Sequence, residues 1–103
     1  MILLARVPGS APTHSVEYQV TGATATVDVT YENQNGDTAQ ANGVAVPWIY
    51  TFTSTEGTFL YVSAQKDGSD TGDVTCSLYV DGVLRESTTS TGAYAICTAS
   101  DSL

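Results

Sequence analysis

Basic residues are scarce in this chain, which has three Lys and Arg against 11 Asp and Glu among its 103 residues. Its formal net charge at pH 7 is −8, and the basic positions Arg6, Lys66 and Arg85 are scattered along the sequence. A protein that binds nucleic acid needs a clustered basic surface, so the composition argues against nucleic acid as a partner. Anionic lipid surfaces are disfavoured by the same charge.

Long apolar runs are absent as well. The apolar start, Met1–Val7, is far shorter than the roughly 20 residues of a helix that spans a bilayer. It also lacks the full pattern of a signal peptide. Three interpretations of this segment stay open: the remainder of an anchor, a misplaced start of the chain, or a first strand. Proline and glycine follow it and favour an extended linker. We expect a flexible segment over residues 1–13 and a single domain over residues 14–103.

Histidine occurs once, at His14, beside the expected linker. A Ser-His-Asp arrangement would depend on this residue. The outward carboxylates are isolated on strands, and local spacing places no pair of them for acid–base work. We therefore expect a protein that is not an enzyme and that binds no cofactor.

The densest acidic stretch is 67–73, where Asp67, Asp70 and Asp73 offer the carboxylate oxygens that Ca²⁺ prefers. The spacing does not match an EF-hand, because Thr71 occupies a position where an acidic or amide ligand belongs. A solvated connection between strands is the preferred interpretation. A calcium site at these three aspartates is the alternative.

Cysteine occurs twice, at Cys76 and Cys97, without other thiols or a histidine cluster. A closed zinc site needs four ligands, so one disulfide is the favoured interpretation. Such a bond stabilises a small domain by about 3 kcal/mol and implies an oxidising compartment. The alternative is a pair of reduced cysteines that pack in the core as small apolar residues.

The abundant residues are those of β-strands, and the clearest segment is 73–87. Apolar residues occupy every second position of its first half, at Val74, Cys76, Leu78 and Val80. This period is typical of a half-buried strand. Asp81-Gly82 then favours a tight turn, because both positions of such a turn need positive φ. The segment is therefore predicted to be a β-hairpin with Cys76 pointing inward.

Further segments alternate in the same way, with turn residues every eight to twelve positions. They are 15–21, 23–31, 48–53, 58–65 and 93–99, with a polar edge segment that follows Asn35-Gly36 and runs through Gln40. The pattern predicts an all-β, immunoglobulin-like, two-sheet antiparallel β-sandwich of about seven strands. Trp48 is predicted in the core. Apolar residues on both faces around Leu60 predict burial on two sides there.

Tyr61 and Tyr79 are the outward-facing aromatic residues that could contact a ligand or partner, including a sugar. Ordinary cross-strand aromatic pairing is the alternative for both.

Three stretches carry a family resemblance: Val16–Gly22, Val46–Phe52, and Cys76–Val83 together with Cys97. From Ser15 onward the chain resembles the extracytoplasmic domain of the MmpS family, the small accessory proteins found with MmpL transporters of the RND type. Family members are β-sandwiches anchored by an N-terminal transmembrane helix. The resemblance covers about 85 to 90 residues.

The resemblance implies a non-enzymatic, extracytoplasmic domain that assists a transporter in the export of lipid or siderophore-type cargo. An RND-type transporter and a lipid-like cargo are the partners it implies. The alternative is a secreted or surface-attached adhesion or ligand-binding module, for example for carbohydrate. The sequence carries no signal for an oligomeric state.

Overall fold

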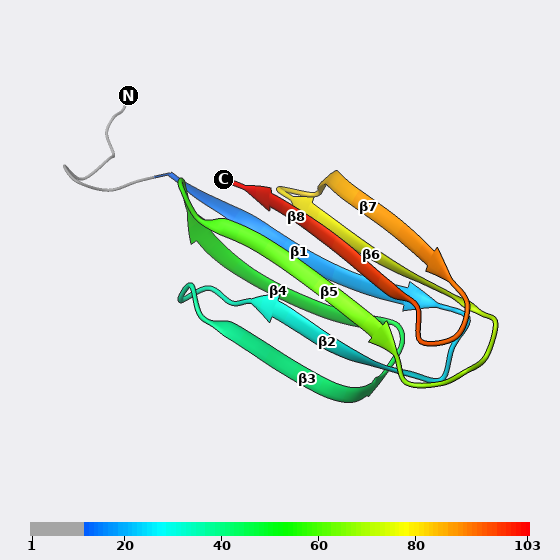
Figure 1. The fold of residues 1–103 in the computed structure, drawn as a ribbon. Helices are drawn as coiled ribbons and strands as arrows, with labels where there is room; N and C mark the ends of the chain where they lie inside the picture. Colours follow the sequence, from blue (N-terminus) through cyan, green and yellow to red (C-terminus); the bar gives the residue numbers. More distant parts are fainter. Residues whose placement is uncertain (1–11) are drawn as a thin grey trace, which may run out of the picture.

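The regular structure is all β. A computed structural model describes residues 12–103, and its strands in this part are β1 (Thr13–Gly22), β2 (Thr26–Glu32), β3 (Thr38–Ala45), β4 (Trp48–Thr55), β5 (Phe59–Lys66), β6 (Asp73–Val80), β7 (Val83–Thr91) and β8 (Ile96–Ser102). They form two four-stranded antiparallel sheets in the orders β4-β1-β6-β7 and β3-β2-β5-β8 (Figure 1). The predicted two-sheet antiparallel sandwich is confirmed, with eight strands. The polar edge segment predicted through Gln40 continues to Ala45 as β3.

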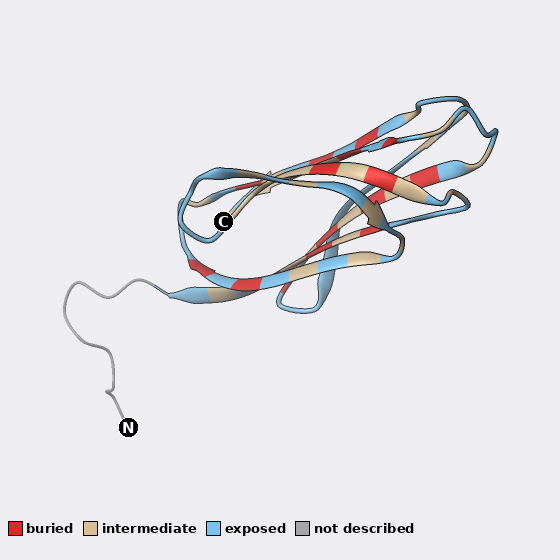
Figure 2. Cartoon of the chain, turned by 90° about the horizontal axis from the view of Figure 1, so that it is seen from below, coloured by how far each residue is buried: buried red, intermediate tan, exposed pale blue. Residues whose placement is uncertain are grey.

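The core lies between the two sheets because alternate residues of the inner strands are apolar. Figure 2 shows the buried positions recurring along the strands. The buried residues of β1 and β6 are Val16, Tyr18, Val20, Val74, Cys76, Leu78 and Val80, and those of β2, β5 and β8 include Val27, Val29, Leu60, Val62, Ala64, Cys97 and Ala99. Full burial of one of the larger apolar side chains among these contributes roughly 1.5–3 kcal/mol to stability. The period of two thus determines which face of each strand is internal.

The predicted hairpin is β6–β7, and its turn is Asp81-Gly82 with φ of 52° and 78°. Positive φ is the reason that Asp and Gly are found at these positions. Cys76 on β6 is bonded to Cys97 on β8, so the predicted disulfide is confirmed. The bond joins one sheet to the other across the core.

Tyr18 also links the sheets. Its buried ring crosses from β1, and its hydroxyl donates to the Glu32 carbonyl at 2.7 Å and accepts the Tyr61 N–H at 3.2 Å. These two backbone groups lie where the pairing between β2 and β5 ends. Burial raises the pKa of Tyr18 to about 12. The hydroxyl therefore stays protonated and satisfies two backbone groups at the edge of the core.

The two lateral sides of the sandwich differ. On one side β7 and β8 are joined by side-chain hydrogen bonds: the Thr88 hydroxyl donates to the Thr98 carbonyl at 2.6 Å, and the Ser90 hydroxyl donates to the Ile96 carbonyl at 2.6 Å. On the other side, where β3 and β4 are not paired in the described part of the chain, aromatic rings lie between the sheets. They are Tyr31, Trp48 and Tyr50, with centroids 4.7 to 6.1 Å apart.

Two expectations for individual residues are wrong. Trp48 faces inward as predicted, but it is only half-buried because β4 is an edge strand. The segment around Leu60 is buried on one face only: Phe59 is 55% exposed, because no layer covers the outer face of its sheet in the described structure. The linker expected over residues 1–13 lies outside the described residues as far as residue 11, and Thr13 is already part of β1.

Candidate functional site

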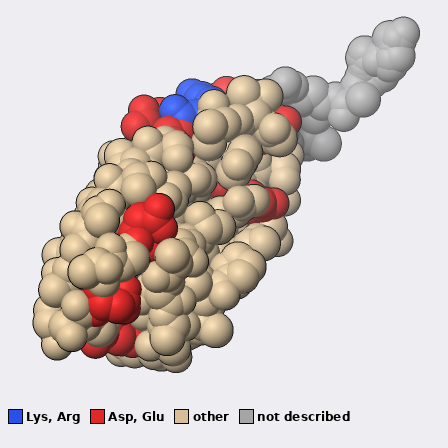
Figure 3. All heavy atoms as spheres, turned by 90° about the vertical axis from the view of Figure 1, so that its right-hand side faces the viewer, with Lys and Arg blue, Asp and Glu red and all other residues tan. Residues whose placement is uncertain are grey.

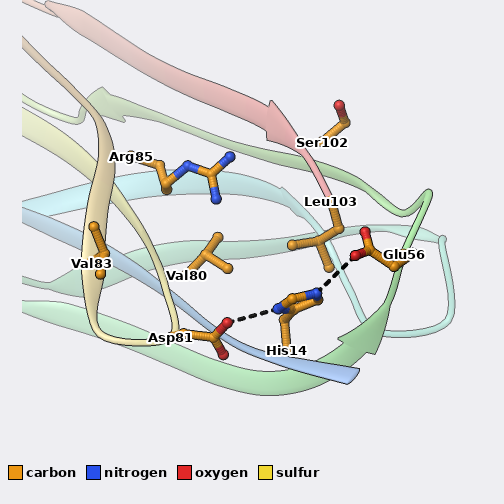
Figure 4. Close-up of a pocket in the computed structure, with 8 residues that line it drawn as sticks. All are labelled: His14, Glu56, Val80, Asp81, Val83, Arg85, Ser102 and Leu103. Carbon is orange, nitrogen blue, oxygen red and sulfur yellow. Dashed lines mark hydrogen bonds and ion pairs between the residues drawn. The ribbon is translucent and has the colours of Figure 1, made fainter. Parts of the chain in front are cut away.

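Four segments meet at one end of the sandwich: the start of β1, the β4–β5 turn, the β6–β7 turn and the end of β8 (Figure 1). A pocket of about 420 Å³ opens there, and Figure 4 shows the residues that line it. We call it the end pocket. The antiparallel pairing of β1 with both β4 and β6 brings these turns together.

His14 lies between two carboxylates at the mouth of the end pocket (Figure 4). Its Nδ1 is 2.7 Å from Asp81 Oδ2, and its Nε2 is 3.2 Å from Glu56 Oε1. A neutral imidazole has one N–H, so only the protonated ring donates to both carboxylates at once. The hydrogen bond with Asp81, followed by that with Glu56, raises the pKa of His14. The protonated ring joins β1 to two turns, and we call this arrangement the His14 clamp.

The backbone holds Asp81 in place as well. Its Oδ1 accepts the Ser15 N–H at 2.9 Å, and its own N–H donates to the Ser15 carbonyl at 2.7 Å. The hydrogen bond with His14, followed by the one from Ser15, lowers the pKa of Asp81. The carboxylate therefore reaches His14 because of the same Asp-Gly turn that the sequence predicts.

Three apolar side chains, Val80, Val83 and Leu103, also line the end pocket (Figure 4). Arg85 also lines the pocket, and its Nη2 is 3.0 Å from Asp101 Oδ2. The charged groups of this end thus already have partners within the protein. A pocket of this kind suits an alkyl or aryl group better than a highly charged ligand.

Tyr79 lines a second pocket of about 350 Å³ on the outer face of the β4-β1-β6-β7 sheet. Its neighbours there are Ser15, Glu17, Gln19 and Gly82. The Gln19 side-chain amide donates to the Glu17 carboxylate. An aromatic ring beside hydroxyl, amide and carboxylate groups is chemically suited to a sugar ring, and we call this pocket the Tyr79 pocket.

Tyr61 lies on the outer face of the other sheet. Its ring centroid is 6.1 Å from that of Phe59, at an interplanar angle of 30°. The structure therefore places Tyr61 and Tyr79 on opposite outer faces of the sandwich and does not bring them together. Each can contribute only to a separate contact surface.

The acidic stretch 67–73 surrounds a lysine. Lys66 is 1% exposed, and its Nζ donates to the carbonyls of Asp70, Gly72 and Gly92 at 2.7, 2.6 and 2.9 Å. Its Nζ is also 2.7 Å from Asp70 Oδ1, and this pairing is the largest cause that lowers the pKa of Asp70. We call this arrangement the Lys66 knot.

The three aspartates proposed as an alternative calcium site have separate partners. Asp67 accepts the Thr26 hydroxyl at 2.9 Å, Asp73 accepts the Ala23 N–H at 3.2 Å, and Asp70 pairs with Lys66. In the described residues no group of three or more His, Cys, Asp or Glu side chains is placed to hold a metal ion.

Sequence reasoning missed the roles of His14 and Lys66. The alternation of β1 places His14 in register with the inward row, but the partners come from turns 42 and 67 positions away. A lysine that ends an otherwise apolar inward row is the one available signal for Lys66, and its three carbonyl partners depend on loop conformation.

The known proteins most informative for this chain are transport accessory proteins. Residues 6–102 match the family described as Mycobacterium membrane protein. The chain is 32% identical over 82 residues to the probable transport accessory protein MmpS5 of Mycobacterium bovis and to the siderophore export accessory protein MmpS5 of Mycobacterium tuberculosis. Each alignment covers 79% of this chain and 56% of the relative, so the chain spans about half the length of these curated relatives.

Among the described residues no helix is long and apolar enough to cross a membrane. The family match covers the whole sandwich, from before β1 to the end of β8, and it includes both cysteines of the cross-sheet disulfide. The predicted resemblance is therefore confirmed, and the chain belongs to the Mycobacterium membrane protein family, that is, to the MmpS family.

Proposed function

We propose that this chain is a non-enzymatic, extracytoplasmic accessory domain that assists an RND-type transporter in the export of lipid or siderophore-type cargo. The observation that carries the proposal is the similarity to relatives named as transport and siderophore export accessory proteins. The family match over residues 6–102 supports the same class of role. A fold can host many functions, so the family and not the sandwich supplies this argument.

The cross-sheet disulfide supports the compartment in this proposal. Cys76 and Cys97 are fully buried and bonded, and disulfides persist in oxidising compartments. An extracytoplasmic location agrees with this chemistry.

Within the proposal, the end pocket faces the membrane side. The resemblance implies an N-terminal anchor, and β1 begins at the end of the sandwich that carries this pocket. Its apolar side chains Val80, Val83 and Leu103 are then presented towards the transporter or the apolar part of its cargo.

The test is crosslinking of the chain in membranes of the organism that makes it, followed by affinity capture and mass spectrometry. Recovery of an RND-type transporter is the expected result. A matched capture with a variant that lacks the crosslinkable handle controls for non-specific membrane protein. If no transporter of this class is enriched over that control, the proposal is wrong.

A second candidate function is carbohydrate binding, favoured by the Tyr79 pocket. Its ring and polar neighbours have the composition of a sugar-binding surface. Tyr79→Ala should then abolish binding to immobilised mycobacterial cell-wall polysaccharide, whereas Tyr61→Ala on the opposite sheet should leave it intact. Equal binding by both variants and the parent would remove the Tyr79 pocket from consideration.

A further inference from the structure

A sandwich of two open sheets has four edge strands, and the unpaired backbone groups of an edge strand can add a strand from another protein. In the described structure these edges are β4 and β7 of one sheet and β3 and β8 of the other. Natural edges are blocked by charges, bulges, glycine or proline, or by cover from other groups. Three of these four edges carry such features.

The edges β7 and β8 block each other. The Thr88 hydroxyl on β7 donates to the Thr98 carbonyl of β8 and also accepts the Thr98 N–H at 3.2 Å. The register of β7 shifts beside β6, so that Arg85 has no opposite residue, and Glu86 follows it. A bulge and two charges make β7 a poor template for a further strand.

The edge β3 is interrupted in its middle. Its register with β2 shifts between Val27 and Val29, opposite Asn42-Gly43. Gly43 has φ +64°, and its N–H donates to the Asp28 carboxylate at 2.8 Å. The bulge bends this edge and removes one of its donors.

The edge β4 has none of these features. Its eight residues, Trp48–Thr55, include no charged residue, no glycine and no proline. Its register with β1 is continuous over eight pairs. Ile49 on its outer face is 55% exposed, and Trp48 and Tyr50 on its inner face are half-buried. This regular and uncharged edge is the one best suited to strand addition.

The direction of its free backbone groups follows from β1. The Ser15 N–H and C=O both bond to Asp81, so they point towards the β6 side. In antiparallel pairing the next residue points to the opposite neighbour, so Val16 bonds to its partner Phe52 on β4. The residues of β4 between such pairs therefore direct their N–H and C=O groups away from β1. These are Ile49, Thr51 and Thr53.

Charge defines the chemistry of the strand that this edge fits. Glu17 lies beside Thr51 in the register of the outer face, and Glu56 follows β4 directly. Neither β1 nor β4 contains Lys or Arg. The Lys and the Arg in the described part of the chain pair elsewhere, Lys66 with Asp70 and Arg85 with Asp101, and His14 on β1 is paired with Asp81 and Glu56. On the face in Figure 3, basic atoms are confined to one place while acidic side chains form separate patches.

A second copy of the chain fits this edge poorly. Each copy carries a net charge of −8. Antiparallel pairing of β4 with itself would also direct the two β1 starts to opposite ends of the dimer, which a shared membrane on that side does not allow. This choice between occupants rests on the function proposed above.

We propose that the free edge of β4 docks an extended, Lys- or Arg-bearing segment of the partner transporter, which adds a fifth strand to the β4-β1-β6-β7 sheet. The main-chain groups of Ile49, Thr51 and Thr53 supply the ladder. Basic side chains on the outer face of the added strand lie towards Glu17, and apolar side chains on its inner face cover Trp48 and Tyr50.

The first test uses the isotope-labelled chain and two short capped peptides, one of alternating Val and Lys and one of alternating Val and Glu. With the Val-Lys peptide at millimolar concentration, the Ile49, Thr51 and Thr53 amides should gain protection from hydrogen exchange and shift in NMR spectra. The Val-Glu peptide should change neither property. Absence of protection at these three amides, or protection that rises with protein concentration without peptide, would contradict the proposal; the latter assigns the edge to a second copy.

The second test compares Thr51→Lys with Ser87→Lys, which make the same charge change on the two edges of one sheet. Thr51→Lys should lose both the peptide effect and the crosslink to the transporter, while Ser87→Lys should retain both. A transporter crosslinked equally by the two variants shows that the function stands and that β4 is not the docking edge. A transporter recovered with neither variant nor the parent contradicts the proposed function itself.

Discussion

The two ends of the sandwich are each organised by one basic side chain, with different surroundings. His14 at the end pocket has a partly exposed side chain and pairs with two partly exposed carboxylates. Lys66 at the opposite end is buried, and its ammonium contacts three carbonyls and one carboxylate. Both join elements that are distant in sequence.

Because of this difference, the two ends have different roles in the protein. The Lys66 ammonium donates in several directions at once, so it holds three carbonyls and the Asp70 carboxylate together. The hydrogen bonds with Asp81 and Glu56 raise the pKa of His14, and its clamp is complete only while the ring is protonated. The Lys66 knot therefore acts as a buried structural element, whereas the His14 clamp depends on pH at the end that carries the pocket.

Removing the buried ammonium of Lys66 should have the largest effect on the free energy of unfolding. Lys66→Met keeps the length of the side chain but leaves the Asp70, Gly72 and Gly92 carbonyls without their donor. A hydrogen-bond acceptor left unsatisfied away from water typically costs about 1–3 kcal/mol, and here three carbonyls lose the same donor. We expect a loss of this size in the free energy of unfolding, measured by urea denaturation. His14→Met at the other end is the matched control and should cost clearly less; an equal loss would contradict the comparison.

Loss of the disulfide should have the next largest effect on stability, and it should affect both ends of the sandwich. The Cys76–Cys97 bond closes a loop that contains Asp81 of the His14 clamp and Gly92 of the Lys66 knot. Loop closure of this length contributes about 3 kcal/mol. Cys76→Ser should lower the melting temperature in oxidising buffer and should change it little under reducing conditions. A parent protein that melts equally with and without reductant would contradict this.

The sequence predicted those parts of the fold that depend on local periodicity. The inward rows of β1, β2 and β6 follow from alternation, and the Asp81-Gly82 turn follows from the need for positive φ. The inward side of Trp48 followed from the same rule. Its half-burial did not, because alternation identifies a face but does not say whether a strand lies at the edge of its sheet.

The candidate sites depend on pairing between distant strands, so less of them was predictable. The Asp67–Asp73 stretch was correctly interpreted as a connection between strands, but its central partner Lys66 was not identified. Tyr61 and Tyr79 were predicted to point outward, and their separation onto opposite sheets needed the topology. The assembly of His14 with Glu56 and Asp81 needed the register of β1 with two neighbours.

The pH dependence of the His14 clamp should be a smaller effect. The folded-state pKa of His14 is raised, so its contribution is fully present below the ordinary value of about 6.5 and is lost as pH rises through the folded value. The pKa of Asp81 is lowered, so its contribution is present above the ordinary value of 3.8 and is lost on acidification through the folded value. The parent should therefore exceed His14→Gln in unfolding free energy by more at pH 5.5 than at pH 9. A constant difference would show that the clamp does not titrate as inferred.

The smallest expected effect is a local one, visible in amide hydrogen exchange of the two ends. Raising the pH from 5.5 to 8.5 should increase the opening of the Asp81 amide, after correction for the intrinsic rate, because the clamp that holds its turn loses a proton. The Tyr94 amide, which donates to Gly68 beside the Lys66 knot, should show no such change, because its hydrogen bond lies at the end opposite the His14 clamp. In His14→Gln the Asp81 amide should lose its pH dependence, and Tyr94 should be unaffected. Parallel opening of both amides in the parent would mean that the sandwich loosens as a whole and that the clamp is not a separate local element.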